Sequence, residues 1–291
     1  MPAIHLKFVL IVLIAFACGC NGVAQKKTFS FETKLPKPLK EVSGLMVVNN
    51  NIWAISDKPK PLIFKLNEKG KLVQEVILKD IPVSDVEAIT SDGTHLYIGD
   101  VGDNDGDRLE RKIIKLQLSA IGQGATASVA GEVIDFSFAG DEIVDRKKEN
   151  NYDCEAMLSF KDSLYLFTKR RADDYAALFV LPNVPGKQHA RLISRFKTDG
   201  LITDAAINPS GNEVALVGYE DGHKKPFVLL FSKFTGNNFF NGTMKRYPLK
   251  ADIKDWQVEG ITYKNDNYIY LSCEQTKDAP ATLYGVEKSN L

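Results

Sequence analysis

A polar residue followed by a small residue and then an apolar one occurs five times along the chain, with glutamate at the polar position in three copies. If the copies meet around one axis, their carboxylates raise one another's pKa values unless a cation neutralises them. Oxygen ligands without histidine or thiolate favour Ca²⁺ over transition metals. We therefore predict an axial Ca²⁺ site whose ligands are Ser43, Glu87, Glu155, Asp204 and Glu259.

These polar side chains have a second interpretation that needs no metal. Carboxylates at the starts of neighbouring strands can accept hydrogen bonds from backbone amides, which are obligatory donors wherever they are buried. The copies would then hold the repeats together through hydrogen bonds and water. The spacing of the residues leaves both interpretations open.

Short strands must position these residues, because each copy begins an apolar segment that is followed by a turn and a second strand. The second unit is the clearest, since apolar and polar residues alternate in its outer strands as in half-buried strands. Its strands are predicted at residues 86–90, 95–100, 111–118 and 132–138. The first unit repeats this order at residues 45–48, 52–55, 62–66 and 72–78.

The last unit is one strand short, because only two strands, at 268–273 and 282–286, follow its polar marker. Residues 28–34 form a strand without a unit and can supply the missing one. Four-stranded units arranged radially make a β-propeller, which leaves few free edges. The predicted fold is all-β, a five-bladed β-propeller closed by the N-terminal strand in the last blade. A sixth blade would need residues 120–130, whose Gly, Ala and Ser content predicts a loop.

In such a ring, the loops between second and third strands lie on the face where the inner strands begin, and these loops carry basic residues. Arginine presents a planar fork of donors to phosphate oxygens, so the loops could bind a phosphate group. A metal or Glu155 could then activate a water for attack on phosphorus. Alternatively, the charges of these loops pair with one another. The basic residues of the loops are Lys58, Arg108, Arg111, Lys169, Arg170 and Arg171. The catalytic candidates are Glu155, Lys169, Arg170 and Asp100.

The N-terminus reads as an export signal. Lys7 precedes an apolar run of about ten residues, which is too short to span a membrane, and small residues follow. The ending resembles a bacterial lipobox, so residues 1–20 are predicted as a lipoprotein signal with Cys20 lipidated. Cys18 is the alternative, as is a secretory signal without lipid. Residues 21–27 would be a tether and 28–291 a single domain of a membrane lipoprotein of the cell envelope, facing the periplasm or the cell surface.

Two cysteines remain in the predicted domain, Cys154 and Cys273. They fall in units that would not be neighbours, so we predict two buried thiols rather than a disulfide. Lysine plus arginine and aspartate plus glutamate each number 37, and this balance gives no support to nucleic acid as a partner. A hydrophobic content of 44% is that of a globular chain.

Two resemblances follow from these motifs. The serine and glutamate markers, with the basic segment 167–171, are similar to those of the calcium-activated apyrase family. That resemblance implies a five-bladed propeller with axial calcium that hydrolyses nucleoside di- and triphosphates, although Asp204 stands where that family has serine. The segments 41–45, 85–89 and 98–104 resemble, more closely, bacterial phytase-like propeller lipoproteins of the SdiA-regulated type, most of which have no known activity.

The function expected from the residues is therefore binding. A lipid-anchored propeller with an axial Ca²⁺ site and a rim of mixed charge suits a module that binds a small anionic or phosphorylated ligand, or a partner. The alternative is a Ca²⁺-dependent phosphohydrolase that acts at the charged mouth on a nucleotide or another phosphate ester.

Overall fold

The structure, a computed structural model, describes residues 28–57, 62–140, 150–220, 224–249 and 256–291. The predicted signal, both candidate lipidation cysteines, the tether and Lys58 lie outside the described residues. Within those residues, no helix combines the length and the apolar character that crossing a membrane requires. The helical elements of this part are four short 3-10 turns at Lys37–Leu39, Leu118–Ala120, Phe239–Asn241 and Lys288–Asn290.

The strands of the described chain form five consecutive antiparallel groups, which confirms the all-β class. The first group is β2 (Val42–Val48), β3 (Asn51–Ser56), β4 (Leu62–Leu66) and β5 (Leu72–Leu78). The second is β6 (Val86–Ser91), β7 (His95–Asp100), β8 (Arg111–Gln117) and β10 (Glu132–Phe138). The third is β11 (Cys154–Phe160), β12 (Ser163–Thr168), β13 (Tyr175–Pro182) and β14 (Gly186–Lys197). The fourth is β15 (Leu201–Ile207), β16 (Glu213–Glu220), β17 (Lys224–Ser232) and β18 (Thr243–Pro248). The fifth is β19 (Val258–Asn265), β20 (Tyr268–Cys273), β21 (Thr282–Glu287) and β1 (Phe31–Lys34).

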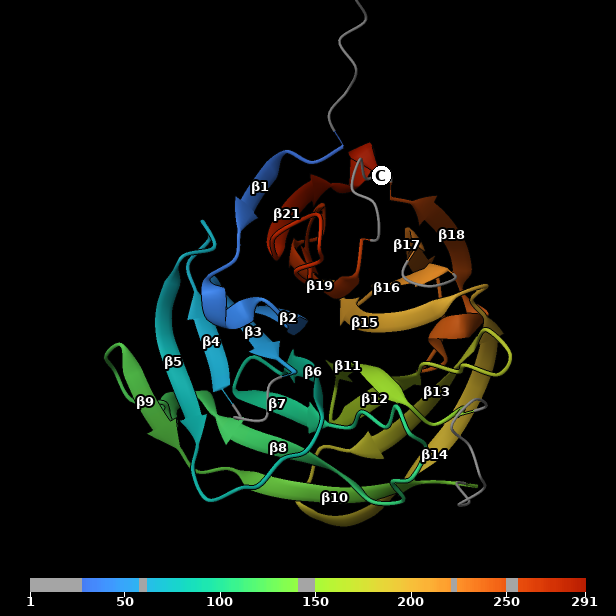
Figure 1. Ribbon diagram of the computed structural model, residues 1–291. Coiled ribbons are helices and arrows are strands. Elements are labelled where there is room, and N and C mark those ends of the chain that lie inside the picture. The colour runs from blue at the N-terminus through green and yellow to red at the C-terminus, as the bar shows by residue number, and fades with distance from the viewer. Residues whose placement is uncertain (1–27, 58–61, 141–149, 221–223, 250–255) are drawn as a thin grey trace, which may run out of the picture.

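The first strands of the five groups surround a common centre. They contact one another in the cyclic order β2, β6, β11, β15, β19 and back to β2, and the later strands of each group lie further out (Figure 1). The N-terminal strand β1 pairs antiparallel with β21, with Phe31 opposite Gly285. The expectation that the N-terminal strand completes the last group is therefore confirmed.

Two pairings join neighbouring groups at their outer edges. β10 runs parallel to β14, and the short strand β9 (Thr126–Val129) runs parallel to β5. The prediction that residues 120–130 are a loop was therefore wrong for β9. Ala127 and Val129 point inward and are buried between exposed neighbours, and this alternation was too short to stand out against the surrounding Gly, Ala and Ser.

The apolar core is divided into five clusters, one between each pair of neighbouring groups. Leu178 of the third group packs in one cluster with Phe227 of the fourth, and Ile63 of the first shares another with Ile98 of the second. The inner strands are buried on both faces, which accounts for their nearly continuous apolar sequences. Cys154 and Cys273 are buried free thiols, as predicted.

Candidate metal and ligand site

Each inner strand carries an irregularity at the same place. One residue has no partner on the second strand, so its side chain is redirected, as at a β-bulge. The five residues are Ser43, Glu87, Glu155, Thr203 and Glu259. Four of these were predicted as markers. In the fourth repeat the equivalent residue is Thr203 and not Asp204, because the irregularity lies between Ile202 and Asp204.

The two hydroxyl residues at this position make the same hydrogen bond. The Ser43 Oγ donates to the Val86 carbonyl at 2.9 Å, and the Thr203 Oγ1 donates to the Val258 carbonyl at 2.7 Å. Each acceptor lies in the next inner strand, directly before a glutamate marker. These hydroxyls therefore link neighbouring repeats at the level of the markers.

Asp204 occupies the position that Gly44, Ala88, Ala156 and Gly260 hold in the other repeats. Its carboxylate is fully buried and accepts the backbone N–H groups of Ala205 and Ile261, each at 2.8 Å, and of Leu45 at 3.4 Å. Burial raises the pKa of Asp204, and the three amides oppose that rise. Asp204 thus caps the strands β19 and β2, as the interpretation without a metal expected of these carboxylates.

The other four predicted ligands meet in one cavity of about 230 Å³. Loops between second and third strands complete its wall, so the expectation that markers and these loops share one face is confirmed. Asp204 does not line this cavity. Its lining residues are Ser43, Asp57, Glu87, Asn104, Glu155, Lys169, Arg171, Tyr219, Gln257, Glu259 and Glu274.

Lys169 is the buried cation of this cavity. Its Nζ donates to the Glu155 Oε2 at 2.5 Å and lies 5.2 Å from the centre of the Tyr219 ring. Although burial alone lowers the pKa of Lys169, the carboxylates around it, Glu155 first, raise it. Burial raises the pKa of Glu155 to about 7 against the pull of Lys169.

Two of the lining carboxylates, Asp57 and Glu87, form a cluster with Asp85, which does not itself line the cavity. Oxygen atoms of Asp57, Asp85 and Glu87 all lie within 4.8 Å of one another. Burial raises the pKa of Glu87, and the neighbouring Glu155 and Asp57 raise it further. The chain passes close to this cluster at Gly102, where an added Cβ would lie 2.7 Å from the Glu87 Cγ and closer still to the Asp85 carboxylate.

Two further carboxylates face the cavity from the fifth repeat. Within the described part of the chain, no donor forms a hydrogen bond to the buried Glu259 carboxylate, and burial raises its pKa well above the ordinary value. Burial, followed by the charges of Asp57 and Glu41, raises the pKa of Glu274 to about 7. Among the described lining residues, carboxylates therefore outnumber the basic side chains, Lys169 and Arg171.

Two of the four catalytic candidates lie elsewhere. Asp100 is fully buried, accepts the N–H groups of Ser84 and Asp85, and pairs with Arg108 at 2.8 Å. Arg170 pairs with Asp173 instead of facing the cavity. Glu155 and Lys169, the other two candidates, line it together.

The basic side chain that joins Lys169 in the cavity is Arg171. Its guanidinium is held by Asp153 at 2.6 Å and by the Asn104 Oδ1 at 2.5 Å. Sequence reasoning did not single out Asp85, Asp153 or Glu274 as site residues. The signal for Glu274 was present, since it begins one of the charged loops on the marker face.

Comparisons with known proteins add little to what the geometry of the site shows. No protein-family model matches the chain, and a search of curated proteins found no match. The chain is similar to a solved protein of unknown function from Bacteroides caccae, with 11% sequence identity and a TM-score of 0.46. That similarity covers 86% of this chain and 78% of the other.

Proposed function

We propose that this chain is a lipid-anchored protein of the cell envelope, attached through Cys20, whose domain is a five-bladed β-propeller that binds Ca²⁺ in its acidic cavity. The cyclic contacts of the five inner strands and the pairing of β1 with β21 support the propeller. The lipobox-like sequence around Cys20 supports the anchor.

The single observation that carries the metal proposal is the cluster of Asp57, Asp85 and Glu87. Ca²⁺ binds oxygen ligands at about 2.3–2.6 Å, so oxygens that surround one ion lie no more than about 5 Å apart. The three carboxylates satisfy that limit. A divalent cation there would remove the repulsion that raises the pKa of Glu87.

The predicted ligand set changes accordingly. Ser43, Glu155 and Glu259 line the same cavity as Glu87, but Lys169 already neutralises Glu155. Asp204 is committed to backbone amides. We therefore place the ion beside Glu87, with Asp57 and Asp85 as further ligands, and leave the Lys169 and Arg171 side of the cavity for a second molecule.

That second molecule would be a small anionic or phosphorylated ligand. Arg171 and Lys169 would face its negative group on one side, and the bound Ca²⁺ would attract it from the other. The same arrangement supports the alternative function of a Ca²⁺-dependent phosphohydrolase. A carboxylate whose pKa is about 7 is matched to general-base work near neutral pH, and Glu155 has that property.

Isothermal titration of the purified, chelator-treated protein with Ca²⁺ tests the metal site. We expect Ca²⁺ binding that Glu87→Gln weakens by at least about tenfold, or about 1.4 kcal/mol. The matched control is Glu132→Gln, which alters an exposed glutamate on β10, far along the chain from the cluster. Equal affinity in both variants, or no binding of Ca²⁺ by the parent protein, would rule out this site.

A phosphate-release assay with nucleotides and phytate then separates the two functions. Binding of Ca²⁺ without turnover supports the ligand-binding module. Turnover that requires Ca²⁺ and is lost in Glu155→Gln supports the hydrolase.

A further inference from the structure

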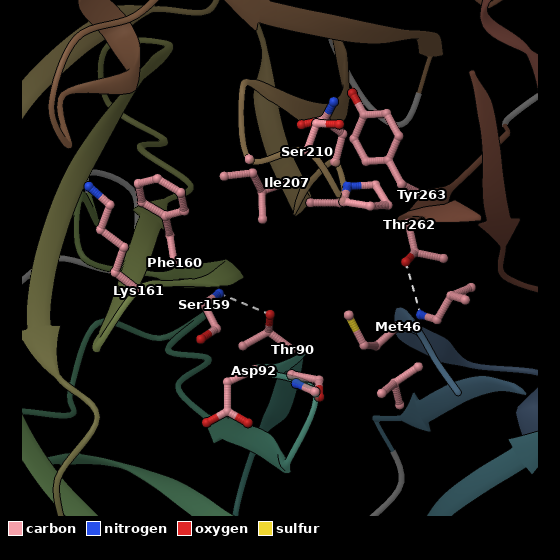
Figure 2. A pocket seen from close by; sticks show the side chains of 18 residues that line it. Met46, Thr90, Asp92, Ser159, Phe160, Lys161, Ile207, Ser210, Thr262 and Tyr263 are labelled. Atoms are coloured by element: carbon pink, nitrogen blue, oxygen red, sulfur yellow. Dashed lines mark hydrogen bonds between the residues drawn. The ribbon is translucent and has the colours of Figure 1, made fainter. Parts of the chain in front are cut away.

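A second cavity, of about 680 Å³, lies where the inner strands end and is lined by different residues from the acidic one. All five repeats contribute to it through the second halves of β2, β6, β11, β15 and β19, and the turns after β6, β11 and β15 also line it (Figure 2). Its volume falls within the range of about 300–1,000 Å³ that is usual for small-molecule sites. The side chains that line this cavity indicate which kind of molecule it could bind.

Two threonine hydroxyls face this cavity with their hydrogens unused. The Thr90 Oγ1 accepts the Ser159 N–H at 3.0 Å, and the Thr262 Oγ1 accepts the Val47 N–H at 3.0 Å (Figure 2). Among the described residues, neither hydroxyl has an acceptor for its own hydrogen. Both residues are more than nine-tenths buried, with 4% and 1% exposed, and each hydroxyl can turn its hydrogen toward an acceptor at the floor of the cavity.

Two polar side chains of the rim, Asp92 and Asn208, are already engaged. Asp92 accepts the N–H groups of Thr94 and His95 and the Tyr97 hydroxyl, which holds its pKa low despite partial burial. The side-chain Oδ1 of Asn208 accepts hydrogen bonds from the backbone N–H groups of Asn212 and Glu213. The cavity thus lacks, in the described chain, the unpaired carboxylates that a metal ion would need.

The walls are apolar and partly aromatic. Met46, Phe160, Ile207 and Tyr263 surround the floor, and Lys161 extends from the rim, with its ammonium 5.1 Å from the Phe160 ring (Figure 2). A ligand that fits must offer acceptor oxygens to the two hydroxyls and apolar faces to the walls. A neutral ligand satisfies the floor, because the two hydroxyls there are uncharged, and the Lys161 ammonium lies at the rim beside the Phe160 ring.

A sugar ring has these properties, since hydroxyl oxygens and apolar C–H faces occur on the same small molecule. We propose that the second cavity binds a neutral carbohydrate through the Thr90 and Thr262 hydroxyls and the apolar wall. This site is independent of the acidic cavity and of Ca²⁺.

The experiment is saturation-transfer NMR of the full chain with a panel of neutral mono- and disaccharides, followed by titration of those that bind. Ile207→Trp fills the cavity without removing a hydrogen bond and is expected to weaken binding by at least about tenfold. Val184→Trp is the matched control, because Val184 is exposed and does not line the cavity. Glu87→Gln and chelation of Ca²⁺ are expected to leave sugar binding unchanged.

Three results would overturn the proposal. The first is that no sugar of the panel binds, which would leave the cavity to water. The second is that Ile207→Trp binds as the parent protein does. The third is that sugar acids or sugar phosphates bind more tightly than their neutral analogues.

Discussion

The Lys169 ammonium contacts the Glu155 carboxylate at 2.5 Å, although the two side chains are only 5% and 6% exposed. A buried ion pair of this kind is costly to break, because removing one partner leaves the other charged and unpaired. Removing Lys169 costs more than removing Glu155, because burial and the Glu155 charge already raise the pKa values of Glu87 and Glu259. Lys169 is therefore the residue on which the charge balance of the cavity depends.

We predict that Lys169→Met destabilises the chelator-treated protein by about 3–5 kcal/mol at pH 8, because the acids around it lose their buried counter-charge. Denaturant unfolding measures the change. Lys161→Met, at an exposed lysine, serves as the control and is expected to stay within about 0.5 kcal/mol of the parent protein. A loss below about 1 kcal/mol for Lys169→Met would show that Glu155 is not paired as described.

The raised pKa values of Glu155 and Glu274 predict a pH dependence. Both pKa values are about 7 in the folded chain, against an ordinary value of 4.5. Between pH 4.5 and 7, the folded state therefore binds more protons than the unfolded state does. The stabilisation that this uptake gives is complete below about pH 4.5 and is lost as the pH rises through 7. Without Ca²⁺, we expect these two groups to contribute less stability at pH 8 than at pH 5.5.

Chemical denaturation at the two pH values measures this effect, with the double variant Glu155→Gln, Glu274→Gln as the comparison. The variant should have a flatter profile between pH 5.5 and 8. Added Ca²⁺ should stabilise the parent protein more at pH 8, where the carboxylates are ionised, than at pH 5.5. An identical pH profile in parent and variant would contradict the assignment.

Asp204 should be a structural residue rather than a ligand. We expect Asp204→Ala to destabilise the protein by several kcal/mol, since buried amides without an acceptor cost about 1–3 kcal/mol each. Asp204→Asn keeps one carbonyl oxygen and should cost less. Thermal unfolding with and without Ca²⁺ separates the roles, because the stabilisation by Ca²⁺ should persist in Asp204→Asn. Complete loss of the Ca²⁺ effect in that variant would return Asp204 to the metal site.

Gly102 should control the geometry of the carboxylate cluster. A methyl group there would press against Asp85 and Glu87, so Gly102→Ala is expected to weaken Ca²⁺ binding without removing a ligand. Calorimetric titration measures the affinity. Gly122→Ala is the control, since its added Cβ would lie 3.9 Å from the Ala127 Cβ, an ordinary contact. Unchanged Ca²⁺ affinity in Gly102→Ala would place the ion elsewhere.

The sequence predicted the strands well where apolar alternation was long. The segment 132–138 has the same limits in the structure, and the polar markers of four repeats were located by spacing. The fourth marker was predicted one residue too late, at Asp204 instead of Thr203. The sequence does not show where a bulge lies in the backbone, and Asp204 carried the charge that the other markers led us to expect. The sequence also could not indicate which charged loop residues face the cavity. Arg170 and Arg171 are adjacent in the chain, yet Arg170 pairs with Asp173 and Arg171 with Asp153.

The pairing of β1 with β21 also has a consequence for how the chain acquires its structure. The strand that contains Phe31 has no partner until the segment around Gly285, more than 250 residues later, is present. Contacts this distant in sequence carry a large loop-closure entropy and fold slowly. During synthesis, which proceeds from the N-terminus, the first four groups can form in turn, while β1 stays unpaired until β21 has been made. Closure is therefore the last step, and until then the nascent chain exposes the free edges of β1 and of its unfinished final sheet.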